Sequence, residues 1–266
     1  AFLIGGIPAL YAIVIWKFVP ESIPYLIHRG RIQEAHELVQ SIERKCGVEV
    51  IEQIEVKQST EQSKGSFRQL WSGIFARRTL MLWLIWFGIV YSYYGIFTWL
   101  PCLLVQQGYS IVQSFEYVLF MILAQLPGYI VAAWLVELWG RKATLAIFIT
   151  MCAISAYFFG QADSVALIML WGCLLSFFNL GAWGVLYTYT PEQYPTHIRA
   201  FGSGWAAAIG RIGGIAAPLA VTHLMVQEGG FGYVFMMFTA VLVAVALIIL
   251  VLGEETQGRT LESISK

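Results

Sequence analysis

Residues 200–226 read AFGSGWAAAIGRIGGIAAPLAVTHLMV, and this stretch decides the class of fold. A helix of about 20 mostly apolar residues is long enough to cross the hydrocarbon core of a bilayer. Between Arg199 and Glu228 the only charged residue is Arg211. The stretch therefore predicts a membrane-spanning helix that carries one arginine in its middle.

The composition of the whole chain agrees with this prediction. Of 266 residues, 58% are hydrophobic and only 12% are charged, whereas soluble domains carry about 25% charged residues. The zero net charge gives no sign of a nucleic-acid partner, and we expect none. The four cysteines occur singly, which argues against a disulfide framework or a metal site. We therefore expect an all-α polytopic membrane protein, surrounded by membrane lipid and without a cofactor.

Seven segments are long and apolar enough to be spans: roughly 1–19, 79–101, 113–137, 143–160, 165–189, 200–226 and 231–252. Residues 20–78 are polar and charged, with helical periodicity in part. Apart from Lys17 at a span end and Arg211, the basic residues fall in this connector, in alternate loops and in the tail, whereas loops 106–110, 160–164 and 227–230 have no Lys or Arg. The positive-inside rule then makes the connector and the C-terminus cytoplasmic.

The number of spans leaves several classes of membrane protein to compare. A seven-helix receptor is one alternative, but the connector is longer than a tight helix pair needs, and no span holds a mid-depth lysine for retinal. An ATP-driven pump is disfavoured because there is no G-x-x-x-x-G-K-[ST] loop. Many secondary transporters consist of two six-helix halves joined by a long cytoplasmic loop. One span, a connector and six spans match the later part of such a protein, which is not an enzyme.

Four motifs resemble those of a known transporter family, the sugar-porter branch of the major facilitator superfamily. PESIPYLIHRGRIQEA (20–35) resembles the segment after helix 6, and ELWGRKATL (137–145) resembles the loop between helices 8 and 9. YTPEQYPTHIRAFGSG (189–204) resembles the signature between helices 10 and 11. GEETQGRTLE (253–262) resembles the closing motif, although Glu254 stands where the family has proline.

The resemblance implies helices 6–12 of a 12-helix fold. Residues 1–19 would be helix 6, 20–78 the cytoplasmic connector between halves, 79–252 the six-helix C-terminal half and 253–266 the cytoplasmic tail. The missing N-terminal half would be a partner, and the plasma (inner) membrane the location. WFGIVYSYYGIFTWLP (86–101) lacks the sugar porters' Gln-Gln-x-x-Gly-x-Asn run. It looks instead like helix 7 of the organic-ion branch and of bacterial niacin and metabolite permeases.

The loop motifs supply candidate gating residues: Glu137, Gly140, Arg141, Lys142, Glu192 and Arg199. A carboxylate near a helix C-terminus is unfavourable to the helix dipole unless a cation lies beside it. The resemblance implies that these loops form charge clusters that latch the two halves together. The alternative is ordinary positive-inside topology with surface ion pairs worth about 0–1 kcal/mol each. The corresponding positions of both motifs in the two repeats favour gating.

Candidate substrate-binding residues lie near the middle of three spans: Tyr93, Tyr94, Gln125, Asn179 and Trp183. Tyrosines ten or more residues into a span lie deeper than the aromatic belts at the membrane surface. Their hydroxyls need partners in a dry site. Helix–helix packing and interhelical hydrogen bonds are the alternative roles for each residue. The resemblance places Tyr93 and Tyr94 on a cavity wall.

Arg211 lies about 18 Å along the helix from Arg199, near the middle of the core. It is about 100° around the helix from a stripe of small residues at every fourth position, Gly202, Ala206, Gly210, Gly214 and Pro218. We expect this stripe to pack closely on another helix. Its guanidinium could snorkel, pair with an acid of the missing half, or bind an anionic substrate. A basic residue here implies, by resemblance, an organic anion.

We therefore predict a secondary active transporter that works by alternating access and is coupled to protons. Its substrate would be a small organic anion such as nicotinate or another aromatic carboxylate. A sugar or neutral-metabolite porter is the alternative within the class.

Overall fold

The computed structural model describes residues 7–47, 66–226 and 229–258, in two compact units, 1–62 and 63–266. The first unit contains α2 (Ile7–Phe18), α3 (Ile23–His28) and α4 (Ile32–Cys46). Ser22 caps α3, and α4 ends at Gly47, whose φ of 69° is the left-handed conformation that favours glycine. The predicted connector, residues 20–78, thus contains helices in its described part, among them α3 and α4.

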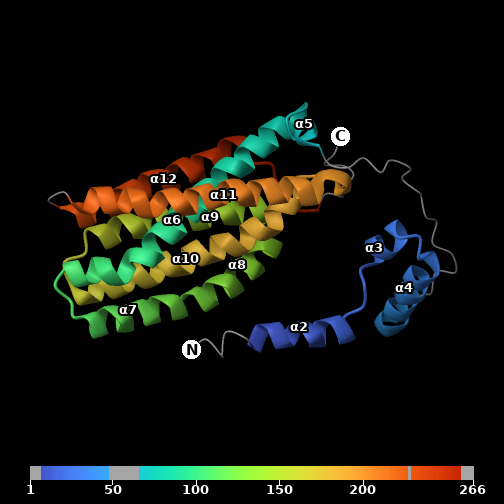
Figure 1. The fold of residues 1–266 in the computed structure, drawn as a ribbon, viewed down its shortest axis with the longest axis horizontal. Helices are drawn as coiled ribbons and strands as arrows, with labels where there is room; N and C mark the ends of the chain where they lie inside the picture. Colours follow the sequence, from blue (N-terminus) through green and yellow to red (C-terminus); the bar gives the residue numbers. More distant parts are fainter. Residues whose placement is uncertain (1–6, 48–65, 227–228, 259–266) are drawn as a thin grey trace. The chain divides into compact units, whose positions relative to one another are not determined.

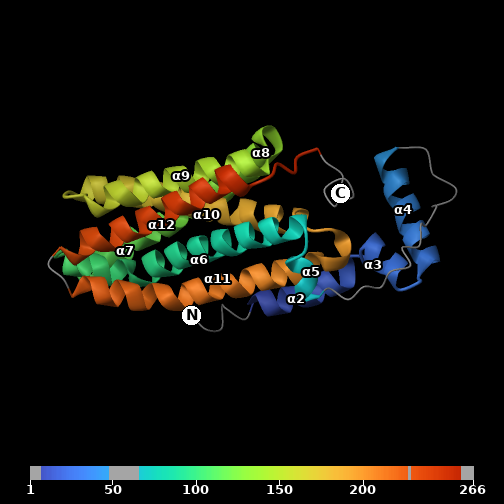
Figure 2. The same ribbon diagram turned by 90° about the horizontal axis from the view of Figure 1, so that it is seen from above.

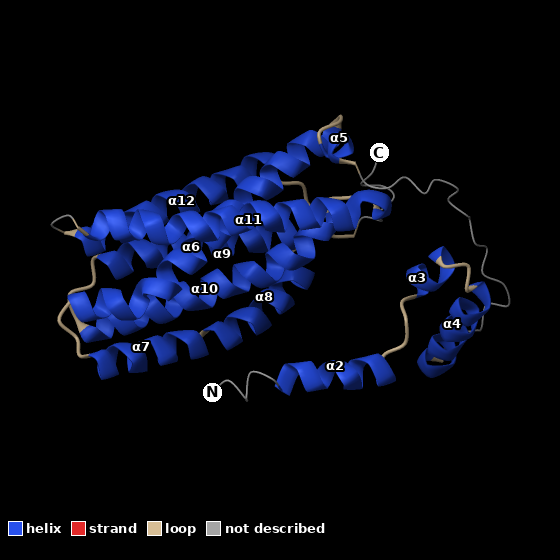
Figure 3. Ribbon diagram, viewed as in Figure 1, coloured by secondary structure: helices blue, strands red, loops and turns tan. Residues whose placement is uncertain are grey.

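The second unit is a bundle of long helices (Figures 1 and 2), preceded by the short α5 (Phe67–Leu70). The described part of the chain is helical apart from turns and loops (Figure 3). The bundle helices are α6 (Ile74–Gln106), α7 (Ile111–Leu123), α8 (Gln125–Trp139), α9 (Arg141–Gly160), α10 (Val165–Glu192), α11 (Thr196–Met225) and α12 (Gly230–Leu252). α6 packs on α11 and α12, and α10 lies between α8 and α9.

Six helical segments of the described chain are long and apolar enough to cross a membrane. They match the predicted spans from residue 79 onwards, with α7 and α8 together forming one of them. The predicted span 1–19 lies partly outside the described residues, and α2 is its described part. The connections α6–α7 and α9–α10 meet at one end of the bundle (Figure 1). The opposite end carries Arg77, Arg141, Lys142 and Arg199, and is called the basic end below.

The predicted span 113–137 is interrupted at Ala124, between α7 and α8. Proline has no N–H, so Pro127 cannot donate to the carbonyl oxygen of Leu123, four residues earlier. α7 ends at Leu123, and α8 starts at Gln125. Gln125, a predicted site residue, therefore stands at a helix break in the middle of a span.

The stripe of small residues on α11 packs against α6, as the sequence predicts for close-packed membrane helices. A Cβ at Gly210 would lie 2.9 Å from one methyl group of Val90, and one at Gly214 would lie 3.3 Å from the other. Beside the stripe, a Cβ at Gly213 would lie 2.5 Å from the carbonyl oxygen of Phe87. Further along α6, a Cβ at Gly95 would meet the ring of Phe238 on α12 and would lie 3.1 Å from the Cβ of Ala217 on α11. α6 is one helix from Ile74 to Gln106, and Gly95 within it allows this close packing.

Candidate functional site

Arg211 lies midway along α11, about 22 Å from Thr196 and about 21 Å from Met225. Its side chain is exposed in the described part of the chain. The guanidinium Nη1 donates a hydrogen bond to the Tyr94 hydroxyl on α6, at 2.9 Å. Among the described residues no carboxylate lies within ion-pair distance of it. The cation is therefore positioned by a neutral partner and keeps donors for another group.

Tyr94 belongs to a set of six aromatic side chains of α6 and α10 that contact one another. We call this set the aromatic face: Trp86, Tyr93, Tyr94, Phe97, Trp183 and Tyr187. The Tyr93 ring centroid lies 5.6 Å from those of both Tyr94 and Trp183. Trp183 is buried and in turn contacts Tyr187, whose own side chain is exposed. These edge-to-face distances are typical of favourable aromatic pairs.

The predicted residues Asn179 and Gln125 are both buried. Asn179 Nδ2 lies 3.5 Å from Ser92 Oγ and from Cys152 Sγ, and its Oδ1 has no partner among the described residues. Gln125 Nε2 likewise has none. The Asn179 contacts support the interhelical role that the sequence left open, and the orphan atoms retain hydrogen-bonding capacity at mid-depth.

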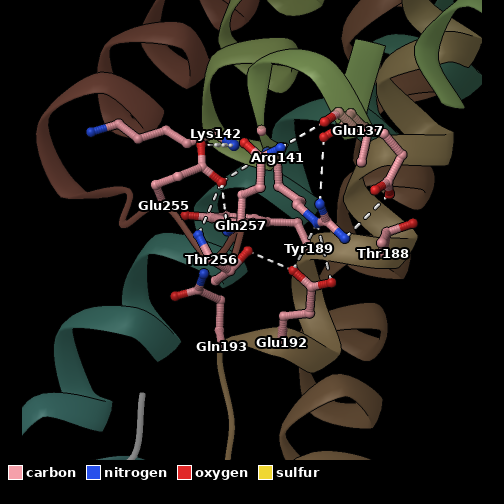
Figure 4. A network of polar contacts seen from close by, with 12 residues as sticks. Glu137, Arg141, Lys142, Thr188, Tyr189, Glu192, Gln193, Glu255, Thr256 and Gln257 are labelled. Atoms are coloured by element: carbon pink, nitrogen blue, oxygen red, sulfur yellow. Dashed lines mark hydrogen bonds and ion pairs between the residues drawn. The ribbon is translucent and has the colours of Figure 1, made fainter. Parts of the chain in front are cut away.

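A second group of polar residues, called the end cluster, lies at the basic end (Figure 4). Arg141 Nε lies 3.2 Å from Glu192 Oε2, and Arg141 Nη2 lies 3.4 Å from Glu137 Oε1. Glu137 is largely exposed, whereas the side chains of Arg141 and Glu192 are only 16% and 23% exposed. Arg141 thus joins the ends of α8, α9 and α10. Arg199, the other predicted cation, donates from Nε to the carbonyl oxygen of Tyr194.

The tail completes the end cluster. The Glu255 carboxylate accepts hydrogen bonds from the backbone N–H groups of Arg141 and Lys142, at 2.9 and 3.0 Å. Gly140 precedes α9 with φ 87° and has no side chain to cap the helix, and a Cβ there would overlap the Glu255 carboxylate. Thr256 donates to Glu192 Oε2, and Gln257 donates to the carbonyl oxygen of Glu137. Glu255 therefore supplies the anion that a helix N-terminus favours.

Glu254, the departure from the family motif, also has a defined partner. Arg78 is buried at the start of α6, and its Nη2 lies 2.7 Å from Glu254 Oε2. The Tyr189 hydroxyl donates to the backbone oxygen of Glu254 and accepts from its N–H. Next to this pair, burial raises the pKa of Tyr194 above its ordinary value, and its hydroxyl donates to Thr79 Oγ1.

Sequence reasoning missed several of these residues for identifiable reasons. Trp86 and Tyr187 are separated by about a hundred positions and become neighbours only when α6 packs beside α10. The tail motif was visible, but its sequence gives no sign of which helix Glu255 caps. The available signal in the sequence was the glycine before α9, which leaves the first N–H groups of that helix without a local side-chain cap.

Comparisons with known proteins identify what this chain is similar to. The sequence profile of the family described as "Sugar (and other) transporter" matches residues 1–266. The chain is 76% identical over 264 residues to the niacin transporter NiaP of Acinetobacter baylyi. It is 28% identical over 273 residues to the inner membrane metabolite transport protein YdjE of Escherichia coli. These matches cover 99% and 100% of this chain, but the chain spans about 60% of the length of each relative.

A solved structure supports the fold. The proton:xylose symporter XylE of the major facilitator superfamily, bound to 6-bromo-6-deoxy-D-glucose, matches with a TM-score of 0.71. The match covers 97% of this chain and 56% of XylE, at 19% sequence identity. The bundle helices α6–α12 therefore have the fold of the corresponding part of a major facilitator transporter.

Proposed function

We propose that this chain, which belongs to the sugar (and other) transporter family, is the C-terminal part of a secondary transporter that moves a small organic anion. The chain is multi-pass, with six described candidate spans. The observation that carries the proposal is Arg211, a mid-depth cation that hydrogen-bonds to Tyr94 and has no ion-pair partner among the described residues. A buried charge in a membrane is costly, so an unpaired one indicates a ligand or a water-filled path.

The chemistry of the surroundings favours an aromatic carboxylate. A guanidinium binds a carboxylate through two parallel N–H···O bonds. The rings of Tyr93 and Tyr94 lie beside the cation and offer edges and faces on which a flat ring can stack. Nicotinate combines both features, and the similarity to a niacin transporter supports it as the substrate. A sugar would leave the charge of Arg211 uncompensated.

The end cluster fits a role in alternating access. In transporters built from repeats, one half rocks against the other about a central site. Arg141 and Glu192 belong to corresponding loops and lie within ion-pair distance of each other, so the cluster sets the relative positions of α8, α9 and α10 at one end. We propose that Glu137, Gly140, Arg141, Lys142, Glu192 and Arg199 hold this end in one of the two access states.

The missing half supplies the other wall of the path. The two spans with the lowest buried share are Ile111–Trp139 and Ile198–Met225, at 28%, compared with 61% for α6. α11 exposes Ile212, Ile215 and Leu219, in addition to Arg211. We propose that the N-terminal half packs on these helices in the inner membrane, with the basic end and the C-terminus in the cytoplasm.

Uptake assays on the full-length protein test the proposal. Labelled nicotinate should accumulate saturably. Unlabelled nicotinate and benzoate should compete with it, glucose should not, and nicotinamide, which lacks the carboxylate, should compete only weakly. A protonophore should abolish accumulation if transport is coupled to protons. Competition by glucose alone would support the sugar porter, and binding without accumulation would support the receptor. Either result would overturn the proposal.

A further inference from the structure

A hollow of about 400 Å³ lies between α9 and α12 and shares no lining residue with the aromatic face. Its floor includes Ala153 and Ala246, which are buried, and its walls include Tyr157, Val243 and Leu247, which are exposed. The two alanines leave space that longer side chains would fill. The hollow is therefore a groove built into the outer surface of these two helices.

The two threonines that line the groove do not offer their hydroxyl hydrogens to a ligand. Thr150 Oγ1 donates to the carbonyl oxygen of Ala146 at 2.7 Å, and Thr239 Oγ1 donates to that of Phe235 at 2.8 Å. Both hydroxyls are thus satisfied within their own helices. A polar or charged ligand would lose its hydration here without replacement. The lining selects a hydrocarbon chain.

The depth of the groove matches the lipid tails. α9 is about 30 Å long, equal to the thickness of a typical hydrocarbon core. Ala153 lies about 18 Å along α9 from Arg141, close to the middle of that core. A lipid whose head group lies at the basic end has its acyl chain at this depth, because one leaflet contributes about 15 Å.

A cation stands where the head group of such a lipid would lie. Lys142 is three helical turns from Ala153, so both are on the same side of α9. In Figure 4 its ammonium group points away from the carboxylates of the end cluster. Its Nζ makes no hydrogen bond or ion pair with the residues that the structure describes. An anionic phosphate complements this charge.

We propose that the groove between α9 and α12 binds one acyl chain of an anionic phospholipid, with the lipid phosphate at Lys142. A second copy of the chain fits less well. Both copies have the same orientation in a membrane, so a symmetric contact through this groove would bring two Lys142 side chains to one depth beside each other. The inference is independent of the substrate proposed for Arg211.

Native mass spectrometry of the full-length protein in detergent, with added dioleoyl phosphatidylglycerol, tests the proposal. We expect one bound lipid on the wild type. Val243→Trp fills the groove and should lower retention about tenfold, because it displaces roughly two methylenes. Met236→Trp is the matched control, since Met236 is 50% exposed on the same helix, Val243 is 45% exposed, and Met236 does not line the groove.

Lys142→Gln tests the head group without changing the groove, and keeps the test valid if Val243→Trp does not fold. It should lower the preference for phosphatidylglycerol over phosphatidylethanolamine about fivefold. Equal retention by Val243→Trp and Met236→Trp, an unchanged lipid preference in Lys142→Gln, or a dimer lost only in Val243→Trp would each overturn the proposal.

Discussion

Replacing Glu255 by alanine should destabilise the bundle although Glu255 lies in the tail, outside every span. In the structure its carboxylate accepts the first N–H groups of α9, from Arg141 and Lys142. Gly140 provides no side-chain cap at that position. Removing a capping side chain costs about 0.5–2 kcal/mol, and a charge at a helix N-terminus contributes about 0.3–1 kcal/mol. We expect a loss of about 2 kcal/mol of unfolding free energy.

Thermal unfolding of the purified full-length protein in detergent measures this loss. We expect the midpoint to fall by about 2 °C in Glu255→Ala, because the unfolding entropy that divides the free-energy loss grows with chain length. Glu255→Gln keeps one acceptor oxygen and should lie between the alanine variant and the wild type. Glu137→Ala is the control, because Glu137 is 72% exposed and its ion pair with Arg141 is worth about 0–1 kcal/mol. A Glu255→Ala midpoint equal to that of Glu137→Ala would refute the capping argument.

Three further variants probe the packing, the gate and the site. Gly213→Ala should lower the unfolding free energy by about 1–3 kcal/mol, because the new Cβ meets the Phe87 carbonyl oxygen at 2.5 Å. Gly204→Ala, whose Cβ would have no atom within 4 Å, should be neutral or stabilising in the same unfolding assay. Arg141→Lys should lower the transport rate several-fold and leave nicotinate affinity unchanged, since it removes the guanidinium that reaches both Glu192 and Glu137. A parallel loss of affinity would contradict the gating role. Tyr94→Phe removes the hydrogen bond that positions Arg211 and should weaken nicotinate binding, measured by calorimetry, about fivefold. Tyr233→Phe on α12 is the control. Unchanged affinity in Tyr94→Phe would show that this hydrogen bond has no part in binding.

The six spans from residue 79 onwards and their order were predictable because each is a long apolar run, and hydrophobic length dominates in a membrane. The small-residue stripe of α11 and the lateral position of Arg211 were also predictable, since helical periodicity fixes both. The end cluster was predictable only in part. Arg141 and Glu192 came from separate motifs, and sequence spacing alone does not show that they meet.

What could not be predicted depends on contacts between distant segments. Glu255 contacts α9 through a tail that lies more than a hundred residues later in the chain. The break before Gln125 had a local signal in Pro127, but membrane helices tolerate many prolines without breaking. The groove between α9 and α12 arises from two alanines on different helices, which look like ordinary small residues in the sequence.

Equilibrium binding of nicotinate and nicotinamide to the full-length protein tests the central claim, that Arg211 binds the substrate carboxylate. Arg211→Ala should weaken nicotinate binding at least thirtyfold, since each charge-assisted hydrogen bond contributes about 1.5–3 kcal/mol. Nicotinamide binding, already weak, should change little, and Arg211→Lys should recover only part of the nicotinate affinity. If Arg211→Ala binds nicotinate as tightly as the wild type does, Arg211 is not the carboxylate-binding residue.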